Sequence, residues 1–123
     1  MAFQGYILVV DDDKVFADLT AEHLAWVGAR VVTAGDAVEA YKKALADPPA
    51  LVVMDVNMPG FGSGLDALRS FRGEVTLQAV PVLIVTGLPP SRLRNADIPA
   101  DRIFYKPVDW GAFKKAVKAA LTP

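Results

Sequence analysis

Runs of consecutive apolar residues alternate along the chain with segments in which apolar residues recur every three or four positions. The consecutive runs contain many β-branched residues and predict strands, most of them buried on both faces, at residues 6–10, 30–34, 51–54, 82–85 and 102–105. The periodic segments predict helices at residues 14–27, 37–46, 65–71 and 110–121. Strands that alternate with helices through short connections predict an α/β fold, with a parallel sheet and helices on both faces.

Capping residues mark the ends of two of these helices. Asp12 or Asp13 can cap the first helix, and Gly28 can end it. Asp36 and Glu39 have the spacing of a capping box, which places the start of the second helix directly after Asp36. The sequence therefore predicts where these two helices begin as well as their approximate lengths.

The segment between the last two strands departs from the regular alternation. Its prolines, Pro89, Pro90 and Pro99, leave room for only a short helix near residues 91–96. We therefore expect a fourth helix, before the last one, that is short or irregular.

The first helix has one apolar stripe that we expect to face the sheet, made of Phe16, Leu19, Thr20, His23, Leu24 and Val27. His23 is the only histidine, and its place on this stripe favours a structural role. Trp26 should point outward. A contact with a partner and a solitary surface aromatic explain Trp26 and Trp110 equally well.

Length and composition limit the class of protein. The chain has 123 residues, enough for one domain that spans residues 1–123, and a net charge of −1 without a basic patch, so nothing supports nucleic-acid binding. The absence of cysteine excludes disulfides and thiolate chemistry. No apolar run approaches the roughly 18 residues of a membrane span, and the first residues lack a signal-peptide pattern, so we expect a cytoplasmic protein without membrane insertion.

Polar side chains follow four of the predicted strands where each strand ends. These residues are Asp11 with Asp12, then Asp55, Thr86 and Lys106. If the strands are neighbours, their carboxylates converge at one edge of the sheet and repel one another unless a cation lies among them. An Asp-Asp pair alone would more simply cap a helix, and Asp13 is better explained as a cap than as a ligand.

Four motifs carry a family resemblance from about residue 6 to residue 121. They are Ile7-Leu8-Val9-Val10-Asp11-Asp12-Asp13, Met54-Asp55-Val56-Asn57-Met58-Pro59-Gly60, Pro81-Val82-Leu83-Ile84-Val85-Thr86-Gly87 and Tyr105-Lys106-Pro107. Together, in this order and at strand ends, they resemble the receiver domain of bacterial two-component response regulators, in particular the single-domain chemotaxis regulators. The resemblance implies a flavodoxin-like, doubly wound fold with five parallel strands in the order 2-1-3-4-5.

The resemblance also implies roles for three residues in phosphoryl transfer. Asp55 would be the phosphoacceptor that attacks the phosphoryl group of a partner's phosphohistidine. Thr86 would donate a hydrogen bond to a phosphoryl oxygen, and Lys106 would pair with the phosphoryl group. Positive charge placed around a transferring phosphoryl group is the main form of catalysis in such reactions.

The same resemblance implies one Mg²⁺ ion. Asp12, Asp55 and the backbone carbonyl of Asn57 would coordinate it, and Asp11 would act through bound water. This agrees with the chemistry of the ion, because Mg²⁺ prefers oxygen ligands and keeps several waters.

Two positions depart from the family pattern. Eight residues after Asp55 the family usually has glycine, whereas this chain has Ser63 followed by Gly64, which suggests an insertion of one residue. Three residues before the lysine the family commonly has an aromatic residue, whereas this chain has Ile103. We therefore expect intact phosphoryl chemistry and an altered output surface.

The resemblance implies a receiver domain, stand-alone or excised from a larger protein, that takes its phosphoryl group from a sensor histidine kinase or a histidine phosphotransfer protein. It would hydrolyse the aspartyl phosphate slowly, would not be a turnover enzyme, and would signal through contacts with a protein target that the sequence does not identify. One alternative is a non-phosphorylated interaction module with the receiver fold. A second is an aspartyl-phosphate phosphatase, which needs an acid-base carboxylate where this chain has Asn57.

Overall fold

The computed structural model describes residues 5–57, 64–93 and 102–122. Its strands are β1 (Tyr6–Val10), β2 (Arg30–Ala34), β3 (Leu51–Met54), β4 (Val82–Thr86) and β5 (Ile103–Tyr105). Its α-helices are α1 (Lys14–Leu24), α2 (Ala37–Ala46), α3 (Gly64–Gly73) and α4 (Trp110–Leu121). Two short 3₁₀ helices, η1 (Ala25–Val27) and η2 (Pro90–Leu93), complete the described elements.

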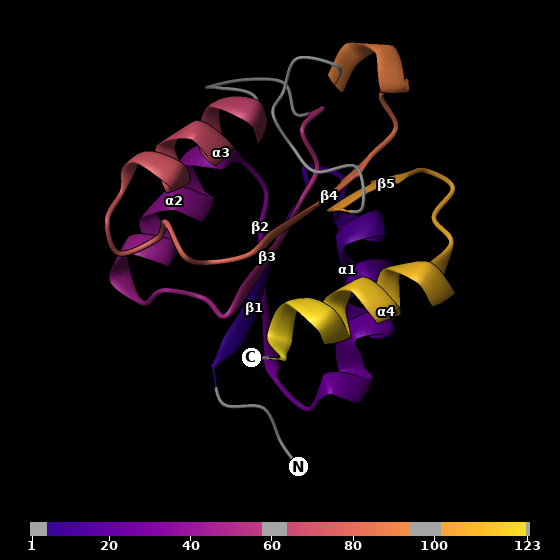
Figure 1. Cartoon of the computed structure of the whole chain (residues 1–123), viewed down its shortest axis with the longest axis horizontal. Coiled ribbons are helices and arrows are strands. Elements are labelled where there is room, and N and C mark those ends of the chain that lie inside the picture. The colour runs from indigo at the N-terminus through magenta and orange to yellow at the C-terminus, as the bar shows by residue number, and fades with distance from the viewer. Residues whose placement is uncertain (1–4, 58–63, 94–101, 123) are drawn as a thin grey trace.

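The five strands form one parallel sheet in the order β2-β1-β3-β4-β5, which confirms the predicted topology (Figure 1). β1, β3 and β4 are the interior strands, and every residue of these three strands is buried. Strands covered on both faces can be apolar throughout, and this is why β1 and β3 are continuous apolar runs.

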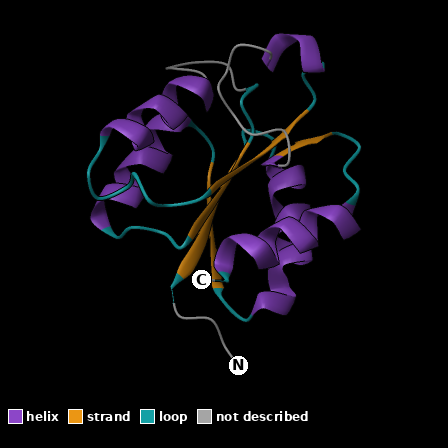
Figure 2. Cartoon of the chain, in the orientation of Figure 1, coloured by secondary structure: helices purple, strands orange, loops and turns teal. Residues whose placement is uncertain are grey.

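Helices cover both faces of the sheet, α2 and α3 on one face and α1 and α4 on the other (Figure 2). Alternate residues of each strand point to opposite faces, so the core divides into two clusters. In β1, Leu8 packs with the α2–α3 cluster, whereas Ile7 and Val9 pack with the α1–α4 cluster. The predicted α/β architecture is therefore confirmed.

Aspartate side chains cap three of the helices, each at the start that the sequence predicts. Asp13 accepts a hydrogen bond from the Phe16 amide at the start of α1, and Asp36 accepts one from the Glu39 amide at the start of α2. Asp109 caps α4 in the same way. Each cap satisfies an amide that the first turn of a helix leaves without a partner.

The predicted first helix is wrong in two details. The α-helix ends at Leu24, and η1 continues it to Val27; the predicted stop at Gly28 is confirmed, with the left-handed φ of 79° that favours glycine. Leu19, expected on the inward stripe, is 38% exposed, whereas the smaller Ala17 is only 2% exposed. Trp26 is 50% exposed, as expected.

The segment after β4 agrees with the expectation of a short fourth helix as far as it is described. η2 is a single 3₁₀ segment of four residues, and the remainder of the predicted helix, from residue 94 on, lies outside the described residues. Among the helices that the structure describes, none is long and apolar enough to cross a membrane.

Phe113 tests the packing of α4 against the sheet, because its side chain is fully buried and its ring meets Phe104 edge-on at 5.6 Å. We expect Phe113→Ala to lower the free energy of unfolding by about 3–5 kcal/mol, since it leaves a cavity in the core. Phe113→Leu should lower the free energy of unfolding by a smaller amount. Urea unfolding measures both, with Lys115→Ala on the exposed side of α4 as the control. A loss no larger than that of the control would contradict this view of the core.

Candidate functional site

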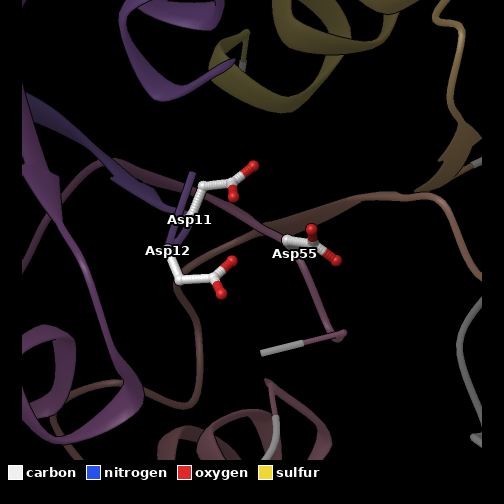
Figure 3. Close-up of side chains that lie close together, drawn as sticks. All are labelled: Asp11, Asp12 and Asp55. Carbon is white, nitrogen blue, oxygen red and sulfur yellow. The ribbon is translucent and has the colours of Figure 1, made fainter. Parts of the chain in front are cut away.

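The carboxylates of Asp11 and Asp55 lie at the carboxyl ends of β1 and β3. The Asp55 amide donates a hydrogen bond to the Val10 carbonyl at 2.9 Å, and the Asp11 amide donates one to the Ala34 carbonyl at 3.1 Å. These bonds continue the pairing of β1 with its two neighbours, so the sheet itself holds both residues in place. Asp12 follows directly and is exposed (Figure 3).

Asp11, Asp12 and Asp55 form an acidic cluster. One carboxylate oxygen from each residue lies within 4.8 Å of the others. Asp11 and Asp55 are buried, whereas Asp12 is exposed to solvent. A set of oxygen donors with one side open to water suits Mg²⁺, which binds carboxylates and retains several waters.

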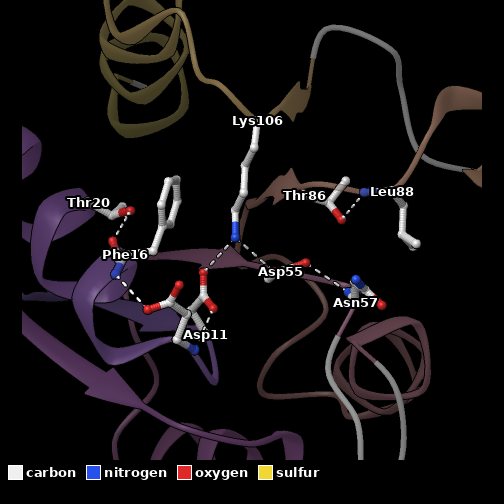
Figure 4. A network of polar contacts seen from close by, with 9 residues as sticks. Asp11, Phe16, Thr20, Asp55, Asn57, Thr86, Leu88 and Lys106 are labelled. Carbon is white, nitrogen blue, oxygen red and sulfur yellow. Dashed lines mark hydrogen bonds and ion pairs between the residues drawn. The ribbon is translucent and has the colours of Figure 1, made fainter.

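Lys106 brings a positive charge to this cluster from the end of β5. Its Nζ lies 3.0 Å from Oδ2 of Asp55 and 3.3 Å from Oδ2 of Asp11 (Figure 4). The lysine side chain is only 24% exposed, so water screens these ion pairs less than it screens pairs on the open surface. One ammonium group therefore bridges the two buried carboxylates.

Each buried carboxylate binds a backbone amide with its second oxygen. Oδ1 of Asp11 accepts a hydrogen bond from the Asp13 amide at 2.9 Å, and Oδ1 of Asp55 accepts one from the Asn57 amide at 2.8 Å. An amide on one oxygen and Lys106 on the other fix the orientation of both groups. The role of the Asn57 carbonyl as a metal ligand stays a prediction.

The site changes the pKa values of Asp11 and Lys106. Burial raises the pKa of the Asp11 carboxyl group; the charge of Asp55 adds to this effect, while the Asp13 amide and Lys106 oppose it. Burial alone would lower the pKa of Lys106. The hydrogen bonds and charges of Asp55 and Asp11 outweigh burial, so the pKa of Lys106 is raised.

Thr86 ends β4 between the acidic cluster and β5, and its side chain is fully buried. Its Oγ1 accepts a hydrogen bond from the Leu88 amide at 3.2 Å, and its carbonyl accepts one from the Lys106 amide at 2.8 Å. The second bond ties the backbone of Lys106 to β4, directly before a cis peptide bond to Pro107. The structure thus brings together the strand-end residues that the sequence singled out.

One departure from the family pattern can be located on β5. Ile103 is half-buried on the α2–α3 side, and Tyr105 on the same side pairs with Thr86 across the two strands. Phe104 faces the α1–α4 cluster instead. An aromatic residue therefore lies beside Thr86, although not at the position where the family commonly has one. Ser63, the other departure, lies outside the described residues.

Sequence reasoning missed the contact between Phe16 and Lys106. The Lys106 Nζ lies 4.0 Å from the centroid of the Phe16 ring. The sequence placed Phe16 on the apolar stripe, and its position three residues after the Asp13 cap could have placed it beside the acidic edge. His23 is half-buried and stacks on Trp110 with ring centroids 4.0 Å apart, which agrees with a structural role.

A family model described as the response regulator receiver domain matches residues 7–118, nearly the whole chain. The chain belongs to the response regulator receiver domain family. It is therefore a receiver domain of two-component response regulators, the class of domain that histidine kinases phosphorylate. The alternative of a non-phosphorylated interaction module is not favoured.

Three relatives of this receiver domain illustrate the match. The chain is 36% identical to response regulator MprA of Mycobacterium tuberculosis over 103 residues, 82% of this chain and 44% of that protein. It is 40% identical to the probable transcriptional regulatory protein TcrX of the same species over 80 residues, 65% of this chain and 33% of that protein. For PhoP of Bacillus subtilis, an alkaline phosphatase synthesis transcriptional regulatory protein, the identity is 32% over 117 residues, 94% of this chain and 48% of that protein. The chain thus spans a third to a half of these relatives' lengths.

Solved receiver structures have the same fold. The response regulator TrrA of Thermotoga maritima, in complex with Mg²⁺-BeF, superimposes with a TM-score of 0.83 at 30% identity, over 96% of this chain and all of that chain. The chemotaxis response regulator CheY4 of Vibrio cholerae gives a TM-score of 0.83 at 24% identity, over 97% of this chain and all of that chain. The second match concerns the fold alone.

Removal of one carboxylate from the acidic cluster tests its fit to a cation. We expect Mg²⁺ to raise the free energy of unfolding of the wild type with increasing concentration, because the ion binds the folded cluster. Asp12→Asn should weaken Mg²⁺ binding at least about tenfold, since a ligand is lost. Titration calorimetry and urea unfolding with added Mg²⁺ measure this. Asp18→Asn, the same charge change on the exposed side of α1, is the control. Equal Mg²⁺ affinity in the two variants would contradict a site at the acidic cluster.

The raised pKa of Lys106 predicts how its contribution to stability varies with pH. In the presence of a chelator, Lys106→Met should lower the free energy of unfolding by about 2 kcal/mol near neutral pH, because it leaves two buried carboxylates without their cation. A raised folded-state pKa means that the contribution is complete below the unfolded value of 10.5 and declines as pH rises through the folded value. The difference between the two proteins should therefore shrink above about pH 10.5. If the difference in free energy of unfolding between the wild type and Lys106→Met stays constant in this pH range, the raised pKa of Lys106 is refuted.

Proposed function

We propose that this receiver domain accepts a phosphoryl group on Asp55 in a Mg²⁺-dependent reaction. The observation that carries the proposal is the position of Lys106, whose ammonium bridges Asp55 and Asp11 at 3.0 and 3.3 Å beside the exposed carboxylate of Asp12. The Asp55 carboxylate is therefore oriented, buried from bulk water and flanked by positive charge.

In the proposed step, Oδ2 of Asp55 attacks the phosphorus atom of a phosphohistidine on the donor. A bond forms between this oxygen and phosphorus as the phosphorus–nitrogen bond breaks, and the electron pair of the broken bond stays on the imidazole of the donor. The product is an aspartyl phosphate. Hydrolysis by water would return Asp55 and release inorganic phosphate, so the domain would undergo modification and slow reversal rather than turn over a substrate.

Lys106 and Thr86 have distinct tasks in this proposal. As a phosphoryl group arrives, the Lys106 ammonium exchanges one carboxylate for a phosphoryl oxygen and so compensates its charge. The Thr86 hydroxyl, at the end of the neighbouring strand, donates a hydrogen bond to a second phosphoryl oxygen. Neither residue takes up a proton, because the reaction depends on orientation and charge.

Asp12, Asp55 and the Asn57 carbonyl would hold the Mg²⁺ ion, with Asp11 acting through a bound water. When bound, the ion supplies positive charge that lowers the repulsion between the acidic cluster and the anionic phosphoryl group. The oxygen donors within 4.8 Å of one another support this part of the proposal, as does the TrrA structure, which is in complex with Mg²⁺-BeF.

The phosphoryl donor in this proposal is a sensor histidine kinase or a histidine phosphotransfer protein in the cytoplasm. We propose that residues 1–123 act as one receiver domain and that the output is a contact with a downstream protein. The curated relatives support the general role, since they are response regulators.

Labelling by a small phosphodonor tests the assignment of Asp55. After addition of acetyl phosphate and Mg²⁺, we expect intact-mass spectrometry to show a gain of one phosphoryl group. Asp55→Ala should abolish this gain, because the nucleophile is removed. Asp13→Ala should leave it largely intact, because Asp13 caps α1 and does not reach the reacting atoms.

Two results would contradict the proposed function. One is an Asp55→Ala protein that takes up the label at the wild-type rate, which would place the acceptor elsewhere. The other is a wild type that binds Mg²⁺ and yet takes no label from acetyl phosphate or from a phosphohistidine donor, which would favour the interaction-module alternative.

A further inference from the structure

The Phe16 ring lies against the cation that the proposed reaction uses. The Lys106 ammonium is 4.0 Å from the ring centroid, while it also donates hydrogen bonds to Asp55 and Asp11 (Figure 4). An ammonium group has three N–H donors, and the carboxylates engage two of its directions. The face of an aromatic ring attracts a cation through its electron density, so Phe16 is a third attractive partner for this ammonium.

The Phe16 backbone is anchored at this position, and its ring has an aromatic neighbour. The Phe16 amide donates a hydrogen bond to the Asp13 side chain at 3.2 Å, and the Phe16 carbonyl accepts one from the Thr20 hydroxyl at 2.9 Å. Trp110, from α4, packs against the Phe16 ring with centroids 5.9 Å apart. Trp110 is itself stacked on His23. The hydrogen bonds therefore fix the Phe16 backbone at the edge of the acidic cluster, and Trp110 packs against the ring.

We propose that Phe16 is a positioning residue for Lys106, an inference that rests on the proposed function. A carboxylate or carbonyl at this place would accept a hydrogen bond from the ammonium and compete with an arriving phosphoryl oxygen. The ring attracts the charge without presenting a lone pair. The ammonium can thus stay over the ring while it exchanges Asp55 for a phosphoryl oxygen.

The electron density of the ring separates this role from simple packing. Stepwise fluorination of phenylalanine withdraws electrons from the ring face and weakens its attraction for a cation, while the shape changes little. If Phe16 only fills space, its fluorinated forms should behave like the wild type. If it positions Lys106, the rate of phosphoryl transfer should fall with each added fluorine.

The experiment uses the full chain with mono-, di- and trifluorophenylalanine introduced at position 16, together with Phe16→Leu. Labelling by acetyl phosphate is followed by intact mass at a Mg²⁺ concentration that saturates each protein. We expect the logarithm of the rate to fall steadily along the series, with a loss of about three- to tenfold for Phe16→Leu. Phe71→Leu is the matched control, because Phe71 is buried on the α2–α3 side of the sheet, and its rate should equal that of the wild type.

A flat rate along the fluorine series would overturn the proposal, as would an equal loss in Phe71→Leu. A thermodynamic cycle between Phe16→Leu and Lys106→Met, measured by urea unfolding, gives a second readout that needs no phosphoryl transfer. A coupling between the two sites supports the positioning of Lys106 by Phe16, and zero coupling contradicts it. A wild type that takes no label would refute the proposed function, and the cycle alone would then decide whether Phe16 holds Lys106.

Discussion

Two carboxylates buried side by side repel each other, and the site depends on how this repulsion is compensated. Lys106 supplies the compensating charge at 3.0 Å from Asp55 and 3.3 Å from Asp11. An arriving phosphoryl group is also anionic. The positive charge of Lys106 that reduces the repulsion between Asp11 and Asp55 is therefore also the charge that the proposed transfer requires. Stability and chemistry therefore rest on the same ammonium group.

The parallel sheet makes this arrangement possible, because it brings the carboxyl ends of all strands to one edge. β1 and β3 are neighbours and carry Asp11 and Asp55, whereas β5 lies two strands away from β3. Neighbouring strands are about 4.8 Å apart, so a side chain from β5 must cross roughly 10 Å to reach the acidic cluster. Lysine is long enough, and Thr86 on the intervening strand is small and buried, which leaves the path open.

The sequence predicted most of the fold, because its signals are local. Buried strands are apolar runs, and caps such as Asp13 and Asp36 mark helix starts with one side chain. The convergence of Asp11, Asp55 and Lys106 also required the strand order, which the resemblance to receiver domains implied. The periodic pattern placed Leu19 on the inward face of the first helix because the pattern favours large apolar residues. The helix instead turns the small Ala17 inward, which lets it pack closely on the sheet.

The contact between Phe16 and Lys106 was not predicted, because it joins side chains far apart in sequence and depends on the placement of α1 above the sheet. The assignment of Asp55 as the acceptor within the acidic cluster can be tested by chemistry on the labelled protein. The most direct measurement is borohydride reduction of the labelled protein followed by peptide mass spectrometry, since borohydride converts an aspartyl phosphate to homoserine. If Asp55 is the acceptor, homoserine should be found at position 55 alone. Homoserine at position 11 or 12, or at no position of a labelled chain, would contradict it.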